Sequence, residues 1–112
     1  MDETNFEWDE AKNRANQKKH GVRFEDAIRV FADPLMLLFP DRYVDGEERW
    51  RAFGRVGNIA VMVVAHTYRT DDGQETIRII SARMATRHER HDYERENYSH
   101  EAERFAAFDG GR

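Results

Sequence analysis

The sequence predicts an α+β domain: two N-terminal helices packed on a four-stranded, mainly antiparallel sheet, followed by one or two C-terminal helices. Three observations predict it. Residues 9–32 are helix-forming with matching start and stop residues, residues 35–82 hold four β-rich segments separated by short turns, and Thr86 opens a further helix. With 112 residues the chain can bury one core. We therefore expect a single domain over residues 1–97 and a helical or frayed extension over 98–112.

The N-terminal part predicts a short extra strand and then a helix. Phe6 and Trp8 alternate with polar residues, which suits a very short strand. Asp9 stands where a helix N-cap belongs, because its carboxylate can accept from the first free backbone amides. Residues 11–19 favour a helix, and Gly21 supplies a left-handed C-terminal stop.

A second helix is predicted over residues 24–32. Its apolar residues recur at helical spacing and form one buried stripe: Phe24, Ala27, Ile28 and Phe31. Pro34 ends this helix, since proline cannot donate and disfavours helical geometry in the residue before it.

The middle of the chain predicts an antiparallel meander of four strands joined by short connections. The expected strands cover residues 35–39, 50–56, 59–68 and 75–82. Pro40 is expected to close the first of them, and residues 41–48 to form a loop. The third strand is apolar on both faces and therefore central. Asp71-Asp72-Gly73 predicts a hairpin turn.

Helix returns at the C-terminus. Thr86 and Glu89 match a capping box, which opens a helix over residues 87–97. A further helical piece is expected beyond it, with one face made by Tyr98, Ala102, Phe105 and Ala106. We expect the helices to cover one face of the sheet.

Composition narrows the functional classes. The chain has no cysteine, which excludes disulfides and thiolate chemistry. Its acidic N-terminus is no signal peptide, and its longest apolar run, residues 59–65, is too short to span a bilayer. We expect a soluble cytoplasmic protein. The net charge is −4, yet residues 11–24 contain five basic residues and no acid, so one basic face is compatible with an acidic total.

Arginines gather where the last strand meets the following helix. Arg78 and Arg83 lie on the strand and just past it, and guanidinium forks suit phosphate oxygens. Strict alternation puts the two on opposite faces, so both reach one site only if the strand ends or bulges near Ser81. The alternative for each arginine is an edge-strand ion pair with a carboxylate. The pair beside a basic helix favours a phosphate site.

Histidines and lysines give further candidates. His66 ends the central strand and titrates near neutral pH, so it is either a buried structural residue or a proton carrier. Lys18, Lys19 and His20 end the first helix, where the helix dipole alone explains them; the alternative is an RNA groove.

A metal site is rejected on the sequence. His88 and His91 are one residue short of the zinc-protease spacing, and neither cysteine nor an acidic cluster stands nearby. We expect no cofactor.

Three stretches together resemble the BrnT family of bacterial toxins. They are FEWDEAKNRANQKKHGVRFEDAIRVFADP, VVAHT and IRIISARMATRHERHDYE, which follow the family's order over residues 6–96. The opening FEWD-x-x-K…KHG-V-x-F-E-x-A and the closing R-I-I-S-A-R-x-A-x-x-x-E-x-x-x-Y are specific motifs.

The resemblance implies a ribonuclease toxin of a type II toxin–antitoxin pair, with a RelE-like fold. Such a toxin cleaves RNA, stops translation and is neutralised by a BrnA-type antitoxin whose ribbon-helix-helix domain binds operator DNA. We expect metal-independent attack of the RNA 2′-hydroxyl on its phosphate. The expected catalytic residues are His66, Arg78, Arg83, His20 and Tyr93, where Tyr93 either aligns substrate or packs. The expected RNA-binding residues are Lys12, Lys18, Lys19, Arg51, Arg87 and Arg90. The alternative is a non-catalytic nucleic-acid- or ribosome-binding module in a repressor complex.

Overall fold

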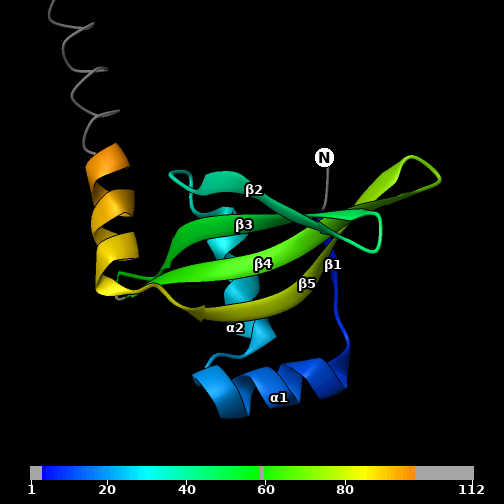
Figure 1. Ribbon diagram of the computed structural model, residues 1–112, viewed down its shortest axis with the longest axis horizontal. Coiled ribbons are helices and arrows are strands. Elements are labelled where there is room, and N and C mark those ends of the chain that lie inside the picture. The colour runs from blue at the N-terminus through cyan, green and yellow to red at the C-terminus, as the bar shows by residue number, and fades with distance from the viewer. Residues whose placement is uncertain (1–3, 59, 98–112) are drawn as a thin grey trace, which may run out of the picture.

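The computed structural model describes residues 4–58 and 60–97 as a five-stranded mixed sheet with helices against it (Figure 1). The strand order is β1-β5-β4-β3-β2. The strands are β1 (Asn5–Glu7), β2 (Leu37–Val44), β3 (Glu47–Val56), β4 (Ala60–Asp71) and β5 (Gln74–Met84). The helices are α1 (Glu10–His20), α2 (Phe24–Ala27), the 3-10 helix η1 (Ile28–Ala32) and a C-terminal helix over residues 87–97. The helical piece expected beyond residue 97 lies outside the described residues.

The α+β class and the antiparallel meander are confirmed, but the expected count of four strands is wrong. The short N-terminal strand exists as β1 and pairs with β5 in parallel, with Phe6 opposite Ile77. It converts a four-stranded antiparallel sheet into a five-stranded mixed one. The central position of β4 is confirmed by the strand order.

Helix α1 begins and ends as its sequence predicts. Asp9 accepts from the backbone N–H of Ala11 at 2.8 Å, and Gly21 takes the left-handed conformation with φ 72°. The helix is nevertheless held to the rest of the molecule by amides instead of an apolar stripe, because its buried residues are Asn13 and Asn16.

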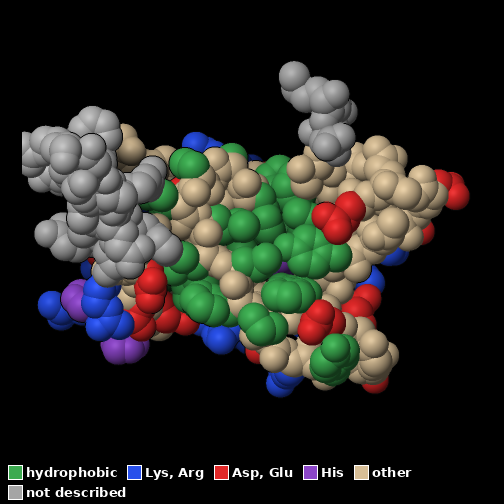
Figure 2. Space-filling view, turned by 90° about the horizontal axis from the view of Figure 1, so that it is seen from above, with side chains coloured by type: hydrophobic (Ala, Val, Ile, Leu, Met, Phe, Trp, Pro, Cys, Tyr) green, Lys and Arg blue, Asp and Glu red, His purple; other side chains and the backbone are tan. Residues whose placement is uncertain are grey.

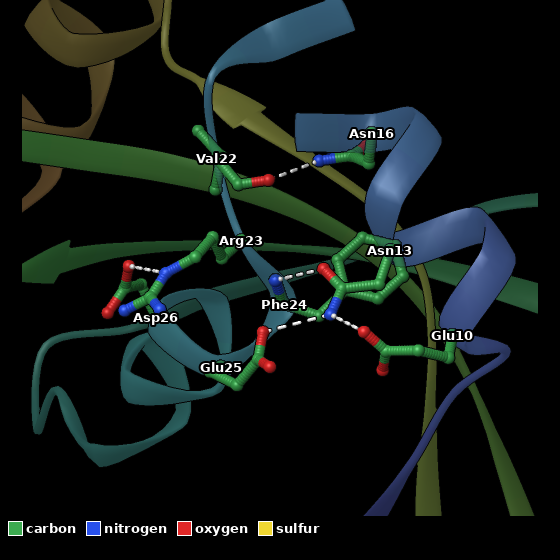
Figure 3. A network of polar contacts seen from close by, with 8 residues as sticks. All are labelled: Glu10, Asn13, Asn16, Val22, Arg23, Phe24, Glu25 and Asp26. Atoms are coloured by element: carbon green, nitrogen blue, oxygen red, sulfur yellow. Dashed lines mark hydrogen bonds and ion pairs between the residues drawn. The ribbon is translucent and has the colours of Figure 1, made fainter. Parts of the chain in front are cut away.

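Figure 3 shows how these two amides fasten α1 to the segment before α2. Asn13 accepts from the backbone N–H of Phe24 at 2.9 Å and donates to Glu10 and Glu25. Asn16 donates to the carbonyls of Val22 and Ala82, and it accepts from the N–H of Ala82 at 3.1 Å. Through Ala82 this contact satisfies part of the β5 edge that β1 leaves unpaired.

Only the first turn of the second predicted helix is α-helical. One α turn, Phe24–Ala27, is followed by the 3-10 turns of η1, which tighten the end of the helix before Asp33. Val30 of η1 packs directly on Gly54 of β3, where a Cβ atom would lie 2.6 Å from the Val30 Cγ1 atom. Gly54 is therefore needed for this close approach.

The predicted end of β2 at Pro40 and the loop over 41–48 are wrong. β2 continues to Val44, and the Asp45-Gly46 turn leads directly into β3. Pro40 is tolerated because β2 is an edge strand, where a missing N–H costs nothing if it faces away from the neighbouring strand. Asp45 and Gly46 have φ 52° and 77°, the geometry of a two-residue hairpin turn.

The prediction that helices cover one face is also wrong, since each face of the sheet has its own core. On the first face, α2 and η1 pack on Ala52, Val64 and Ile79. On the second face, Tyr93 of the C-terminal helix packs with Phe53, Val61 and Val63. The second core is small, and among the described residues the C-terminal helix packs on only a part of the second face. Among the described residues, no helix is long and apolar enough to span a membrane.

Candidate functional site

A bulge in β5 brings the two arginines of the last strand to one face. The register of β4 against β5 shifts between Ala65 and His66, and Ile80 is the extra residue on β5. One extra residue reverses the alternation beyond it, so Arg78 and Arg83 both point to the second face. The condition stated from the sequence, a bulge near Ser81, is confirmed.

Arginines from three strands converge on a pocket in the uncovered part of the second face. The pocket has a volume of about 330 Å³. It is lined by Asp41, Arg42, Arg49, Arg51, Val63, Ala65, Ile80, Ser81 and Arg83. We call it the arginine pocket. β2, β3 and β5 supply the charged side chains, while β4 supplies a small, apolar floor.

Two of these arginines are incompletely satisfied. The Nε atoms of Arg49 and Arg51 are buried and have no hydrogen-bond partner among the described residues. The nearest carboxylate to Arg51 is Asp41, whose Oδ1 lies 4.0 Å from the Nε atom, too far for a hydrogen bond. Because a buried donor without an acceptor is costly, the pocket is suited to an anion that supplies the missing acceptors.

Arg83 is held in place by Glu89 from the C-terminal helix. Its two terminal nitrogens donate to the two carboxylate oxygens at 2.7 and 2.9 Å, a bidentate pair. The hydrogen bonds from Arg83 lower the pKa of Glu89 to about 2. Glu89 also completes the capping box, since it accepts from the N–H of Thr86 at 2.9 Å. One carboxylate therefore both starts the helix and orients the arginine.

Tyr93 serves as a buried link between the C-terminal helix and the segment before β2. Its side chain is almost fully buried, and its hydroxyl donates to Asp33. Asp33 also accepts from the backbone N–H groups of Leu35 and Arg55 at 2.9 and 2.7 Å. Burial, together with the hydrogen bond to Asp33, raises the pKa of Tyr93 to about 12. In this position the hydroxyl packs and does not face the arginine pocket.

His66 lies on the first face, away from the arginine pocket. It has no exposed surface and stacks edge-on against Phe31 of η1 at 4.8 Å between ring centroids. Its Nδ1–H donates to the carbonyl of Val64, and the hydroxyl of Tyr68 donates to Nε2. Burial lowers the pKa of His66, so the neutral ring is favoured. This geometry separates His66 from the arginines with which the sequence grouped it.

The other predicted site residues lie outside the arginine pocket's lining, apart from Arg51 and Arg83. Arg78 faces the same side of the sheet but is opposite Thr67, beyond the pocket. His20 is half-buried at the end of α1. The remaining five are exposed on α1 or on the C-terminal helix: Lys12, Lys18, Lys19, Arg87 and Arg90.

The sequence reasoning missed three charged residues of the pocket. Arg42 and Asp41 fell in the segment wrongly assigned to a loop, and Arg49 lies just before the strand predicted at Trp50. Arg49 and Arg51 are two residues apart on β3, which places them on one face and could have revealed the cluster. Within the described residues, no group of three His, Cys, Asp or Glu side chains is placed to hold a metal ion.

Comparison with known proteins identifies the family. Residues 8–89 match the family described as "Ribonuclease toxin, BrnT, of type II toxin-antitoxin system". Among solved structures, the 1.1 Å crystal structure of the Brucella abortus ribonuclease toxin BrnT is similar, with a TM-score of 0.57 and 25% sequence identity over 75% of this chain and 97% of that chain. No curated protein matches. The family match covers well over half of the chain, and it confirms the resemblance carried by the motifs: the chain belongs to the BrnT family of type II ribonuclease toxins.

Proposed function

We propose that this protein is an endoribonuclease that cleaves RNA at the arginine pocket without a metal ion. The observation that carries the proposal is the pair of buried Nε atoms on Arg49 and Arg51, which have no hydrogen-bond partner in the part of the chain that the structure describes. A phosphate diester bound between them would accept both hydrogen bonds in a partly desolvated site. Family membership supplies the substrate class, and the pocket supplies the anion-binding geometry.

The reaction is an internal transesterification. The 2′-hydroxyl attacks the adjacent phosphorus, the bond to the 5′-oxygen breaks, and a 2′,3′-cyclic phosphate remains. Arg51 and Arg83 stabilise the additional negative charge as it develops on the phosphate oxygens. Arg51 has no bidentate carboxylate partner among the described residues, whereas Arg83 is pre-positioned by Glu89.

The proton of the 2′-hydroxyl needs an acceptor in the pocket. Asp41 is the carboxylate that lines it, and we assign it this role. The leaving 5′-oxygen takes its proton from water. His66 and Tyr93, which the sequence grouped with the catalytic residues, act in this proposal through packing, because both are buried and bonded elsewhere. Arg78, His20 and the exposed basic residues of α1 and the C-terminal helix guide the RNA strand through charge.

Family membership supports the proposed cellular role. Cleavage of messenger RNA inhibits translation in the cytoplasm. A BrnA-type antitoxin neutralises the toxin, and its ribbon-helix-helix domain attaches the complex to operator DNA. Operator contact by the toxin is thus indirect.

The test uses purified full-length protein, freed of any partner and treated with chelator, on a defined RNA. Cleavage that leaves 2′,3′-cyclic phosphate ends is expected, and a 2′-deoxy substitution at the scissile nucleotide should abolish it because the nucleophile is absent. Cleavage of that deoxy substrate would refute the mechanism. An intact fold that binds RNA without cleaving it would favour the alternative, a non-catalytic RNA- or ribosome-binding module.

A further inference from the structure

A second hollow adjoins the arginine pocket on the same face. It lies between β2, β3 and the C-terminal helix and has a volume of about 320 Å³. Its apolar surface comes from Leu37, Phe39 and Phe53. Its helical wall carries the carboxylates of Asp92 and Glu96 and the guanidinium of Arg95, which donates to Asp92 at 3.1 Å. We call it the aromatic groove.

The two hollows share a boundary. Arg51 lines both of them, and Glu89 of the groove is bonded to Arg83 of the arginine pocket. Phe39 is opposite Arg51 in the β2–β3 register, so the aromatic ring and the guanidinium are neighbours on one face. When the anionic group of a ligand binds in the arginine pocket, the neighbouring part of the ligand can therefore lie in the aromatic groove.

The groove also offers an exposed aromatic ring. Phe39 is 44% exposed although it packs edge-on against Phe53, with 5.6 Å between ring centroids. Figure 2, seen from above the view of Figure 1, shows hydrophobic side chains gathered in the middle of the molecule's upper side. Aromatic rings exposed next to a phosphate site are the usual stacking surface for RNA bases.

We propose that the aromatic groove is a nucleobase subsite that selects guanine next to the phosphate held in the arginine pocket. The carboxylates are the reason for guanine. Asp92 and Glu96 can only accept hydrogen bonds when ionised. Guanine is the RNA base whose pairing edge presents two adjacent donors, N1–H and the 2-amino group, which match the two oxygens of one carboxylate. Glu96 offers such a pair of oxygens within the described residues, whereas Asp92 already accepts from Arg95 and lies beside His88. Adenine, cytosine and uracil each place an acceptor beside their donor, and a carboxylate repels it.

The same carboxylates argue against other parts of a nucleic acid in this groove. The lining carries three carboxylates, Glu89, Asp92 and Glu96, against two guanidinium groups, Arg51 and Arg95, so its net negative charge disfavours a phosphate but not an uncharged base. We therefore assign the phosphate to the arginine pocket and the base to the space between Phe39 and the carboxylates of the C-terminal helix. The inference rests on the proposed function for its choice of RNA as the ligand.

The experiment is equilibrium binding of three nucleotides to the full-length protein by calorimetry: guanosine, inosine and adenosine 3′-monophosphate. Inosine differs from guanosine only by lacking the 2-amino group. Guanosine 3′-monophosphate is expected to bind about 10-fold more tightly than either of the others, the size of one well-made base contact. Equal binding of the three would overturn the proposal.

Matched variants locate the effect. Asp92→Asn with Glu96→Gln should remove the preference for guanine, whereas Glu94→Gln, which removes one carboxylate from the same helix outside the groove, should keep it. Phe39→Leu should weaken all three nucleotides about 10-fold through lost stacking but leave the affinity for inorganic phosphate unchanged. Tyr43→Leu, on the same strand and 70% exposed, is its control. A guanine preference that survives the Asp92 and Glu96 changes would overturn the assignment.

The outcomes separate this inference from the catalytic proposal. Selective binding of guanosine 3′-monophosphate by a protein that cleaves no RNA would support the subsite and refute the catalysis. Cleavage that ignores base identity would support the catalysis and refute the subsite. Protection of the groove by a bound antitoxin, with no nucleotide preference in the free protein, would overturn the subsite and assign the groove to a protein partner.

Discussion

The two faces of the sheet are made from alternate residues of the same strands, and they differ in almost every physical respect. On the first face, Ala52 and Val64 have no exposed surface beneath α2 and η1. Their neighbours on the second face, Arg51 and Ala65, pair in the same register but lie at the edge of the arginine pocket. One face is a closed core, and the other is a small core beside an open charged hollow.

This difference shows how one sheet separates stability from function. The first face buries apolar area and so contributes most of the free energy of folding. Among residues 4–58 and 60–97, Tyr93 and its helix cover only a part of the second face, which leaves room for ligands. Residues on the two faces should therefore respond in opposite ways to substitution. The predictions below test that opposition, from the largest expected effect to the smallest.

The sharpest contrast compares two phenylalanines. Phe24→Ala removes a fully buried ring from the first core and should lower the free energy of unfolding by about 4 kcal/mol. Phe39→Ala removes a ring that is 44% exposed on the second face and should cost about 1 kcal/mol. Urea denaturation followed by circular dichroism measures both. Similar losses for the two variants would mean that the second face carries a core of equal weight.

The next contrast concerns activity. Arg51→Ala should reduce RNA cleavage about 100-fold by removing a guanidinium group from the arginine pocket whose Nε atom has no acceptor among the described residues, with little change in stability. His66→Leu should do the reverse: it should lower the melting temperature, because a buried, hydrogen-bonded ring is lost, and leave the rate per folded molecule nearly unchanged. Cleavage rates and thermal melts of both variants decide this. A large loss of the cleavage rate in His66→Leu with an unchanged melting temperature would show that His66 takes part in catalysis.

The Arg83–Glu89 ion pair should make the free energy of unfolding depend on pH under acidic conditions. The pKa of Glu89 is lowered from 4.5 to about 2 in the folded protein, chiefly by the hydrogen bonds from Arg83. A lowered carboxyl pKa contributes stability that is complete above pH 4.5 and is lost as the pH falls towards 2. This contribution to the free energy of unfolding should be about 2 kcal/mol.

Glu89→Gln is the matched variant for this measurement. Glutamine keeps the capping box but not the charge. The free energy of unfolding of the variant should therefore fall by about 2 kcal/mol less than that of the wild type as the pH is lowered from 5 to 2. Parallel urea titrations of both proteins between pH 5 and 2 supply the comparison. Curves of identical slope would show that the ion pair adds no stability.

The smallest expected effect lies on the first face, near neutral pH. Burial lowers the pKa of His66 below its ordinary value of 6.5, so the unfolded chain binds a proton more readily than the folded one. Stability should therefore fall as the pH drops below 6.5. Thermal melts of the wild type and of His66→Leu between pH 7.5 and 5.5 should differ in slope, with the flatter curve for the variant. Parallel curves would contradict a neutral, buried His66.

Much of the fold could be predicted because its causes are local. Asp9 and Gly21 bound α1, Thr86 and Glu89 begin the C-terminal helix, and Asp72-Gly73 turns the chain between β4 and β5. Each of these depends on a few neighbouring residues whose hydrogen bonds or φ angles are set by their own chemistry. The motifs of the BrnT family can be recognised in the same way, because each is contiguous in the sequence.

The candidate site could be predicted only in part, since it depends on register. The sequence located Arg83 and Arg51, and it stated that a bulge must exist if Arg78 and Arg83 share a face. It could not say that His66 points to the closed face, because a shift of one residue in the pairing exchanges the two faces. Arg42 was missed because its segment was predicted to be a loop, and Arg49 because it precedes the predicted strand. Their side chains meet only once β2, β3 and β5 are aligned.

By itself, then, the sequence determined the ends of α1, the start of the C-terminal helix, the turn at Asp72-Gly73, the strand-rich middle and the family. Only the tertiary structure decided that β1 adds a fifth, parallel strand, that the helices divide between two faces, and that four arginines surround one pocket. The physical reason is the range of the interactions. Caps and turns are fixed within a few residues, whereas facing, burial and convergence of charge depend on pairing between strands that are distant in the chain.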